Sequence, residues 1–311
     1  YCLARTPRGV EVFRTSDGEI VSRLEAPGVQ GSGVLAFNDR GDQAAWLSEG
    51  RIVWWEIESG SRLADFYLAS LQGGDLAFVG KGLALVGGDL VDLQNRLVLW
   101  RYEQASRHGR YRAGYFWNVV RAGQVEGLVP VALPHAEALQ RRGDITQPAA
   151  LAVEHGTRIA VDNQVHDDNR EKFASALQSA VESAELQEAS DASLRLIARL
   201  GEVKTEQQSY RRFGESLFSE GTQVTVETGR TYQIALESNG KTYWQTQLSS
   251  SGLTRMHVRM KEGESIGEAV QRETNERSSG RQYGFAMPPF IVEPSEAGPL
   301  GVSKLTLSGI E

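Results

Sequence analysis

Four side chains that are able to bind a metal ion lie close together in the sequence: Asp162, His166, Asp167 and Asp168. Carboxylate and imidazole groups are common metal ligands, and a loop between a strand and a helix is a suitable place for them. The same residues also fit the start of a helix, because aspartate there interacts with free backbone N–H groups and the positive helix end. We prefer this capping interpretation, and we assign no metal site.

Glycine recurs between residues 73 and 93, which raises the question of a phosphate-binding loop. Such a loop would require a strand, the spacing GxxxxGK[ST] and a helix in that order. Lys81 follows a single glycine, and the flanking residues are typical of strands. We therefore interpret this stretch as β turns: the glycines concerned are Gly73, Gly74, Gly80, Gly82, Gly87 and Gly88.

A serine hydrolase would be expected to contain a G-x-S-x-G nucleophile elbow. Gly31-Ser32-Gly33 lacks the spacing, and Gly214-Glu215-Ser216 lacks the closing glycine. Catalytic groups can also be assembled from positions far apart in the sequence, where no motif marks them. The five histidines, at 108, 135, 155, 166 and 257, show no catalytic spacing. We assign no catalytic, cofactor-binding or metal residue and expect a protein that is not an enzyme.

Arginine and aromatic residues alternate along the segment from 107 to 121. They could form a cation–aromatic binding strip, but a solvated turn beside a buried hairpin (115–120 with 128–133) explains the same pattern and is the interpretation we prefer. The tripeptide Arg142-Gly143-Asp144 is found in cell-adhesion ligands, but here we expect an ordinary linker. The strip would comprise Arg107, Arg110, Tyr111, Arg112, Tyr115, Trp117 and Arg121.

The most conspicuous feature of the chain is a repeated element between Gly33 and Trp100. Leu35-Ala36-Phe37 opens one copy and Leu76-Ala77-Phe78 opens the next, 41 residues later, while the closing Trp55 and Trp100 are 45 residues apart. A fainter copy ends at Phe13, 42 residues before Trp55. Strand-forming repeats of about 40 to 45 residues are typical of β-propeller blades.

This pattern resembles the WD40-repeat family, in which a Leu-Ala-Phe-like strand, a polar Gly turn and a closing Val-x-x-Trp-Asp strand recur. Here the closing pairs are Phe13-Arg14, Trp55-Glu56 and Trp100-Arg101, so the aspartate of the family motif is absent, and the Gly-His that often opens a repeat is absent too. The resemblance covers roughly residues 1–105 and implies blade architecture more than any one function.

We interpret residues 1–135 as a partial β-propeller of about three blades, followed by a linker at 136–148. Propellers typically have about four to eight blades, and Tyr1 lies in what we interpret as a strand. We therefore expect further blades upstream, in preference to blades from elsewhere in an assembly. A targeting signal would be lost with them, so the compartment stays open between the bacterial cytoplasm and the cell envelope.

Residues 149–311 change to an α+β pattern with hairpins and an extended Pro-rich tail. Asp168 and Glu171 form a capping box, and an apolar stripe then predicts a helix of about 17 residues that covers a sheet. Asn239-Gly240 predicts a tight hairpin, and Glu264–Thr274 a second helix. The stripe consists of Phe173, Ala176, Leu177, Ala180, Val181 and Ala184. This element order is similar to the small domain of TolB-type envelope proteins, although no motif is shared.

The totals count against several classes of protein, although a local basic patch is compatible with the overall charge. The net charge is −7, and the excess of acidic residues lies in residues 151–311, whereas a nucleic-acid binder would show a basic face. Cys2 is the single cysteine, so no disulfide can form within the chain and a Cys-based zinc site is excluded. No run of about 18 apolar residues exists that would predict a membrane-spanning helix.

Three functions agree with these observations. We favour a non-enzymatic scaffold that binds protein partners or assembles with itself. The first alternative is a propeller hydrolase or lyase whose site lies in the central channel and is completed by missing blades. The second is a carbohydrate or envelope-polymer binder that uses Trp54, Trp117 or Trp244 as stacking platforms, although tryptophans of β structure are usually buried.

Overall fold

The computed structural model describes residues 1–6, 9–26, 33–71, 74–105, 109–122, 125–167, 169–210, 222–251, 258–279, 285 and 287–311. Strands make up most of the regular structure. The chain forms two compact units: unit 1 comprises residues 1–157, 183–186 and 286–311, and unit 2 comprises residues 158–182 and 187–285. Among the described residues, no helix is both long enough and apolar enough to cross a membrane.

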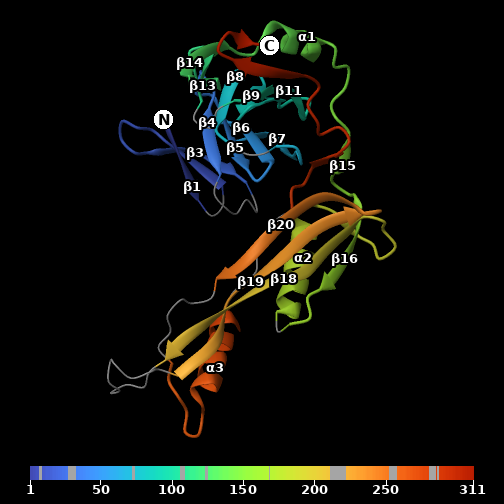
Figure 1. The fold of residues 1–311 in the computed structure, drawn as a ribbon. Coiled ribbons are helices and arrows are strands. Elements are labelled where there is room, and N and C mark those ends of the chain that lie inside the picture. Colours follow the sequence, from blue (N-terminus) through green and yellow to red (C-terminus); the bar gives the residue numbers. More distant parts are fainter. Residues whose placement is uncertain are drawn as a thin grey trace. The chain divides into compact units, whose positions relative to one another are not determined.

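Unit 1 is a propeller-like arrangement of four antiparallel blades (Figure 1). Consecutive strands of each blade are hydrogen-bonded to one another. The blades are β1–β3 (Cys2–Thr6, Gly9–Phe13, Ile20–Glu25), β4–β7 (Val34–Phe37, Gln43–Ser48, Arg51–Glu56, Arg62–Tyr67), β8–β11 (Leu76–Gly80, Leu83–Val86, Asp89–Asp92, Leu97–Glu103) and β12–β14 (Arg110–Arg112, Tyr115–Ala122, Val125–Ala132). We expected about three blades; the structure has a fourth because β12 adds to the hairpin expected at 115–133.

The second and third blades continue beyond their fourth strand into segments from far along the chain. The parallel pairing of Ile291 with Tyr67 adds β21 (Ile291–Val292) to β7, and β15 (Leu151–Val153) follows on the far side of β21. In the third blade, β22 (Val302–Thr306) pairs in parallel with β11, and β23 (Gly309–Ile310) adds to β22. These additions cover strand edges that would otherwise be open for pairing.

This pairing differs from the division of the chain that we expected. We placed residues 149–311 together and interpreted the tail as an extended segment on a surface, but residues 149–157 and 286–311 belong to unit 1 because their strands extend its blades. The stretch interpreted as a linker contains helix α1 (Ala136–Gly143). Arg142 at its end donates to the buried carboxylate of Asp92 at 2.7 Å, so the helix is held against the third blade.

Apolar side chains between the blades form the core of unit 1. One cluster joins the first two blades around Trp46 and Trp55, each no more than 1% exposed. Trp55 Nε1 also donates to the Glu25 carbonyl oxygen at 3.1 Å, which links the second blade to the first. A larger cluster joins the second, third and fourth blades with Ala138 of α1 and Leu305 of β22. Burying this apolar surface is the main force that holds the blades together.

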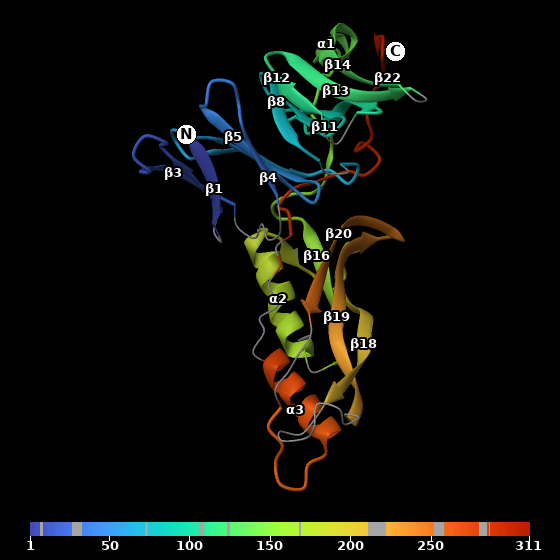
Figure 2. The same cartoon turned by 60° about the vertical axis from the view of Figure 1, so that its left-hand side comes forward.

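Unit 2 has one mixed sheet in the order β17-β16-β18-β19-β20. Helix α2 (Arg170–Ser183) lies along one face of it (Figure 2) and buries Phe173, Ala176, Leu177, Ala180 and Val181, which confirms the expected stripe. Asp168 of the expected capping box lies outside the described residues. The strands are β16 (Arg158–Gln164), β17 (Gln187–Glu188), β18 (Arg195–Tyr210), β19 (Thr222–Ser238) and β20 (Lys241–Ser251).

Residues with a positive φ form the turns of two hairpins, among them the hairpin predicted from Asn239-Gly240. Asn239 and Gly240 have φ values of 52° and 75° between β19 and β20, the conformation that a type I′ turn requires. Gly18 between β2 and β3 has a φ of 75°. Helix α3 (Ile266–Ser279) begins close to the expected residue 264 and contacts β19. Residues Thr222–Ser238 form the single long strand β19 that leads into the Asn239-Gly240 turn.

Candidate functional site

The fourth blade has one buried face and one exposed face. Strand alternation buries Phe116, Asn118 and Val120 of β13 and turns Tyr115, Trp117 and Val119 to the opposite side. Cross-strand pairing places Pro130 opposite Trp117 and Leu128 opposite Val119. We call the outward side, formed by Tyr115, Trp117, Val119, Leu128 and Pro130, the blade-4 face.

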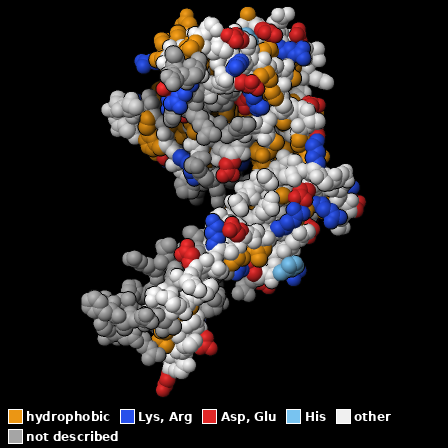
Figure 3. Space-filling view, viewed as in Figure 1, with side chains coloured by type: hydrophobic (Ala, Val, Ile, Leu, Met, Phe, Trp, Pro, Cys, Tyr) orange, Lys and Arg blue, Asp and Glu red, His pale blue; other side chains and the backbone are white. Residues whose placement is uncertain are grey.

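The blade-4 face exposes large apolar side chains. Leu128 is 62% exposed, Tyr115 is 47% exposed and Trp117 is 40% exposed. Hydrophobic side chains gather where β13 and β14 lie in the space-filling view (Figure 3). Exposed residues of this size that adjoin one another are typical of interaction surfaces, whereas single exposed apolar residues are common everywhere.

Arginines rim the blade-4 face. Arg110 and Arg112 of the edge strand β12 pair with Trp117 and Tyr115, and Arg110 also forms an ion pair with Asp75. Arg121 lies at the far end, where its Nε is 3.1 Å from Glu126 Oε1. These residues belong to the cation–aromatic strip considered from the sequence, so the structure brings most of that strip together.

Tyr111 and Arg107 are the two members of the strip that the structure does not place on the blade-4 face. Tyr111 is opposite the buried Phe116, and its hydroxyl donates to the Leu133 carbonyl oxygen at 3.2 Å. Burial and the negative charge of Asp39 raise the pKa of Tyr111 above its usual value. Arg107 lies outside the described residues.

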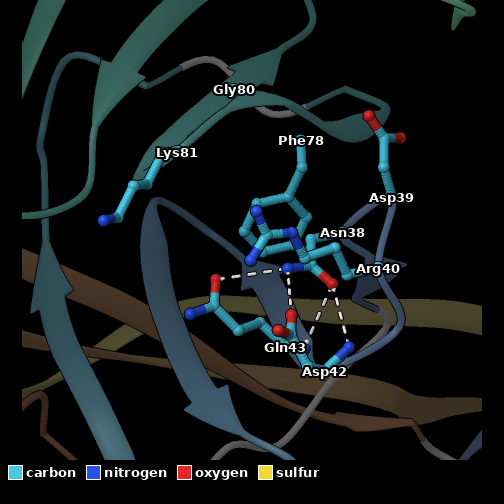
Figure 4. A pocket seen from close by; sticks show the side chains of 8 residues that line it. All are labelled: Asn38, Asp39, Arg40, Asp42, Gln43, Phe78, Gly80 and Lys81. Carbon is cyan, nitrogen blue, oxygen red and sulfur yellow. Dashed lines mark hydrogen bonds between the residues drawn. The ribbon is translucent and has the colours of Figure 1, made fainter.

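A second recess lies between two equivalent turns of the second and third blades. The pocket has a volume of about 260 Å³ and is lined by Asn38, Asp39, Arg40, Asp42, Gln43, Phe78, Gly80 and Lys81 (Figure 4). The first five residues belong to the β4–β5 turn and the start of β5, and the other three belong to the end of β8 and the start of the β8–β9 turn. The first turn directly follows its Leu-Ala-Phe triplet and the second comes two residues after its own, so the repeat itself marks the position of this pocket.

Asn38 organises the side chains on one side of this pocket. Its Oδ1 accepts from the backbone N–H groups of Asp42 and Gln43 at 3.1 Å each. Its Nδ2 is 2.5 Å from Asp42 Oδ1 and 3.4 Å from Gln43 Oε1. The two acceptors are therefore held in place by the Asn38 amide, which fixes the turn and the orientation of Gln43.

Two of the four residues considered as metal ligands, Asp162 and Asp167, are engaged in other contacts. Asp167 Oδ2 accepts from the Tyr232 hydroxyl at 2.8 Å and from Arg230, and Asp162 accepts from Gln164 Nε2 at 2.7 Å. His166 is exposed. In the part of the chain that the structure describes, no three His, Cys, Asp or Glu side chains are grouped to hold a metal ion.

The contacts of Asp167 explain its electrostatics. Burial acts to raise its pKa, but hydrogen bonds from the Asn169 backbone N–H, the Tyr232 hydroxyl and Arg230, together with the charge of Arg230, outweigh that effect and lower the pKa of Asp167. Asn169 Nδ2 also donates to the Tyr232 hydroxyl at 2.8 Å. This cluster fastens the start of α2 to β19.

The other candidates from the sequence are distributed as follows. Trp54 and Trp244 are each 6% exposed, so of the three stacking platforms considered, Trp117 alone lies at the surface. Gly80, Gly82 and Gly87 lie in β turns or at strand ends. Glycines 31, 73 and 214, Ser32, Glu215, Ser216, His108 and His257 lie outside the described residues.

Comparison with known proteins adds little. No family model matches the chain, and no curated protein matches it. The crystal structure of lipoprotein GNA1162 from Neisseria meningitidis is 14% identical over 40% of this chain and 96% of that chain, with a TM-score of 0.19. A minor lipoprotein from Acinetobacter baumannii is 11% identical over 40% of this chain and 86% of its own, with a TM-score of 0.20. Neither likeness is close enough to indicate a fold or a function.

Proposed function

We propose that this chain is a non-enzymatic scaffold whose propeller-like unit binds a protein partner through the blade-4 face. The observation that carries this proposal is the exposure of Tyr115, Trp117 and Leu128 side by side on one face of a rigid sheet. Adjacent blades in this unit bury such faces against each other. The blade-4 face has the same alternation, but among the described residues no neighbouring sheet covers it. It is therefore suited to binding the surface of another protein.

The composition of the blade-4 face supports a protein partner. Tryptophan, tyrosine and arginine are the residues most enriched at the centres of protein interfaces. The neighbouring edge strand β12 is only three residues long and carries Arg110 and Arg112. Short, charged edge strands discourage strand-to-strand pairing, so the partner would bind on the face of the sheet and not along its edge.

The WD40-like character of the repeats agrees with this role. Rigid blades hold side chains at fixed positions, which lowers the entropy lost on binding. The similarity of element order to TolB-type proteins makes the cell envelope one place in which such a scaffold would act.

Carbohydrate binding is a second candidate because Trp117 is exposed and Arg110 is its cross-strand neighbour. An aromatic ring with adjacent hydrogen-bond donors suits a sugar, but Leu128 and Val119 extend the face in apolar residues that a sugar would not use. Titration with an oligosaccharide, followed by tryptophan fluorescence, would distinguish this role: a saturable shift that Trp117→Ser removes would favour a glycan over a protein.

Site-specific photocrosslinking tests the protein-binding role. A photoreactive amino acid is placed at position 117 in the protein produced by its native cells, and at position 63 as a control, because Leu63 of β7 is 44% exposed on another blade. We expect a discrete higher-mass adduct from position 117 and none from position 63. The double variant Tyr115→Ser and Leu128→Ser should abolish that adduct. Equal crosslinking at both positions, or an adduct that the double variant leaves unchanged, would refute the assignment.

A further inference from the structure

We propose that the pocket between the β4–β5 and β8–β9 turns binds a carboxylate group. This inference does not rest on the blade-4 face or on a protein-binding role. It starts from the hydrogen bonds that Asn38 makes. Because Asn38 Nδ2 donates to Gln43 Oε1 at 3.4 Å, the Oε1 atom is directed toward Asn38, and the Gln43 Nε2 group is the part left to face the pocket (Figure 4).

Two cations line the same pocket. Arg40 comes from the β4–β5 turn and Lys81 from the equivalent turn of the next blade, and both side chains are exposed. Within the described residues, neither side chain forms a hydrogen bond or an ion pair, in contrast to Arg142 nearby, which binds Asp92 and the Lys81 carbonyl oxygen. The groups available to a ligand are therefore an amide N–H₂, a guanidinium and an ammonium, all of which are donors.

The acids that line the pocket set the charge of the ligand. Asp42 is held by the Asn38 amide at 2.5 Å, and the carboxylate of Asp39 points away from the cluster of Asn38, Arg40 and Gln43 (Figure 4). The four charged side chains of the lining sum to zero. A singly charged carboxylate adds one negative charge to this balance, whereas a phosphate dianion adds nearly two and would meet more repulsion from the two aspartates. A planar carboxylate also matches the fork of an arginine.

The pocket is open at the surface, and its volume of about 260 Å³ lies just below the range of about 300 to 1,000 Å³ typical of drug-sized ligands. This size suits a small carboxylic acid or a single acidic side chain of a peptide, with Phe78 contributing apolar contact for the methylene groups. The shared chemistry is the carboxylate, and the experiment below separates the two sources.

Nuclear magnetic resonance titration of the full ¹⁵N-labelled chain tests this proposal. The four probes are acetate, inorganic phosphate, the capped peptide Gly-Glu-Gly and its neutral counterpart Gly-Gln-Gly. We expect saturable shifts of the Gln43 side-chain amide and the Gly80 backbone amide at millimolar concentrations of acetate or of the Glu peptide. Binding of acetate alone identifies a small acid as the ligand, and tighter binding of the Glu peptide identifies an acidic protein segment.

Variants connect the shifts to the named donors. Arg40→Gln and Lys81→Gln should each weaken carboxylate binding about fivefold, the order expected for one exposed charged contact. Gln43→Glu replaces donors by acceptors and should remove binding. Arg141→Gln on the exposed side of α1 is the control for loss of one positive charge and should leave binding unchanged. Absence of saturable shifts, stronger binding of phosphate than of acetate, equal binding of both peptides, or equal weakening by Arg141→Gln would overturn the proposal.

Discussion

The buried ion pair between Arg51 and Asp65 in the second blade allows the sharpest test of the fold. Arg51 Nε and Nη2 donate to the two carboxylate oxygens of Asp65, both at 2.7 Å. The side chains are 8% and 2% exposed. Arg62, which is 41% exposed, donates a third hydrogen bond to Asp65 at 2.7 Å. Asp65 therefore relies on Arg51 for most of its neutralisation away from water.

Replacing Arg51 by Met leaves the carboxylate of Asp65 buried with Arg62 as its remaining charged partner. Breaking a buried pair by removing one member costs about 3 to 5 kcal/mol. Because Arg62 persists, we expect a loss near the lower limit, about 3 kcal/mol in the free energy of unfolding. The double variant Arg51→Met and Asp65→Leu removes both charges, so it should recover most of that loss.

Urea denaturation followed by tryptophan fluorescence measures these changes, since Trp46, Trp54 and Trp55 all lie in the second blade. The matched control is Arg14→Met, which removes an arginine from an exposed ion pair with Asp17 and should leave the denaturation midpoint unchanged. The reasoning is refuted if Arg51→Met shifts the midpoint no more than the control does. It is also refuted if the double variant is as unstable as the single one.

Three further predictions concern other contacts. Gly301→Ala would drive a Cβ atom into the Trp100 ring, so we expect the free energy of unfolding, measured by urea denaturation, to fall by about 1 to 3 kcal/mol. An unchanged denaturation midpoint would contradict this packing. Burial lowers the pKa of His135 below 6.5. As the pH falls below about 6.5, the unfolded chain therefore takes up a proton at this position before the folded chain does, and the free energy of unfolding declines. His135→Gln should flatten this pH dependence of the free energy of unfolding. Tyr232→Phe removes a buried hydroxyl that donates to Asp167, so we expect the free energy of unfolding to fall by about 1 to 3 kcal/mol. Tyr243→Phe, at a partly exposed site, is the control and should not reproduce this loss.

Several elements could be predicted from the sequence alone. The Leu-Ala-Phe triplets at 35–37 and 76–78 lie in β4 and β8, the first strands of successive blades. The apolar stripe from Phe173 to Val181 lies on α2, and the Asn239-Gly240 hairpin forms as expected. The triplets are recognised by their repetition 41 residues apart. The helix and the hairpin depend on residues that are close in the chain, through a period of 3.6 residues and through a turn that requires a positive φ.

Pairing between distant segments could not be predicted in the same way. Val302 to Lys304 pair with Arg101 to Glu103. A strand of five residues carries no local information about a partner about 200 positions earlier in the chain. This explains why the tail was assigned to the second domain. The short β21 gives even less signal, because it consists of two residues.

The candidate surfaces were only partly predictable. Period-two alternation of Tyr115, Trp117 and Val119 indicates that they share a side of one strand, but not that this side stays uncovered. The pocket turns could be found from the repeat, yet the direction of the Gln43 amide follows from the Asn38 contacts, which only the three-dimensional structure shows.

Because β21 to β23 follow unit 2 in the chain, two blades of unit 1 are completed only after unit 2 has been synthesised. Apart from residues 183–186, unit 1 is built from chain segments that lie before residue 158 and after residue 285. As the polypeptide leaves the ribosome, β7 and β11 must therefore wait with unpaired backbone edges while the whole of unit 2 is made. Their final partners emerge only with residues 291–310. During that interval, a nascent chain is exposed to strand exchange with its neighbours on the same messenger RNA, and premature termination would leave that exposure permanent.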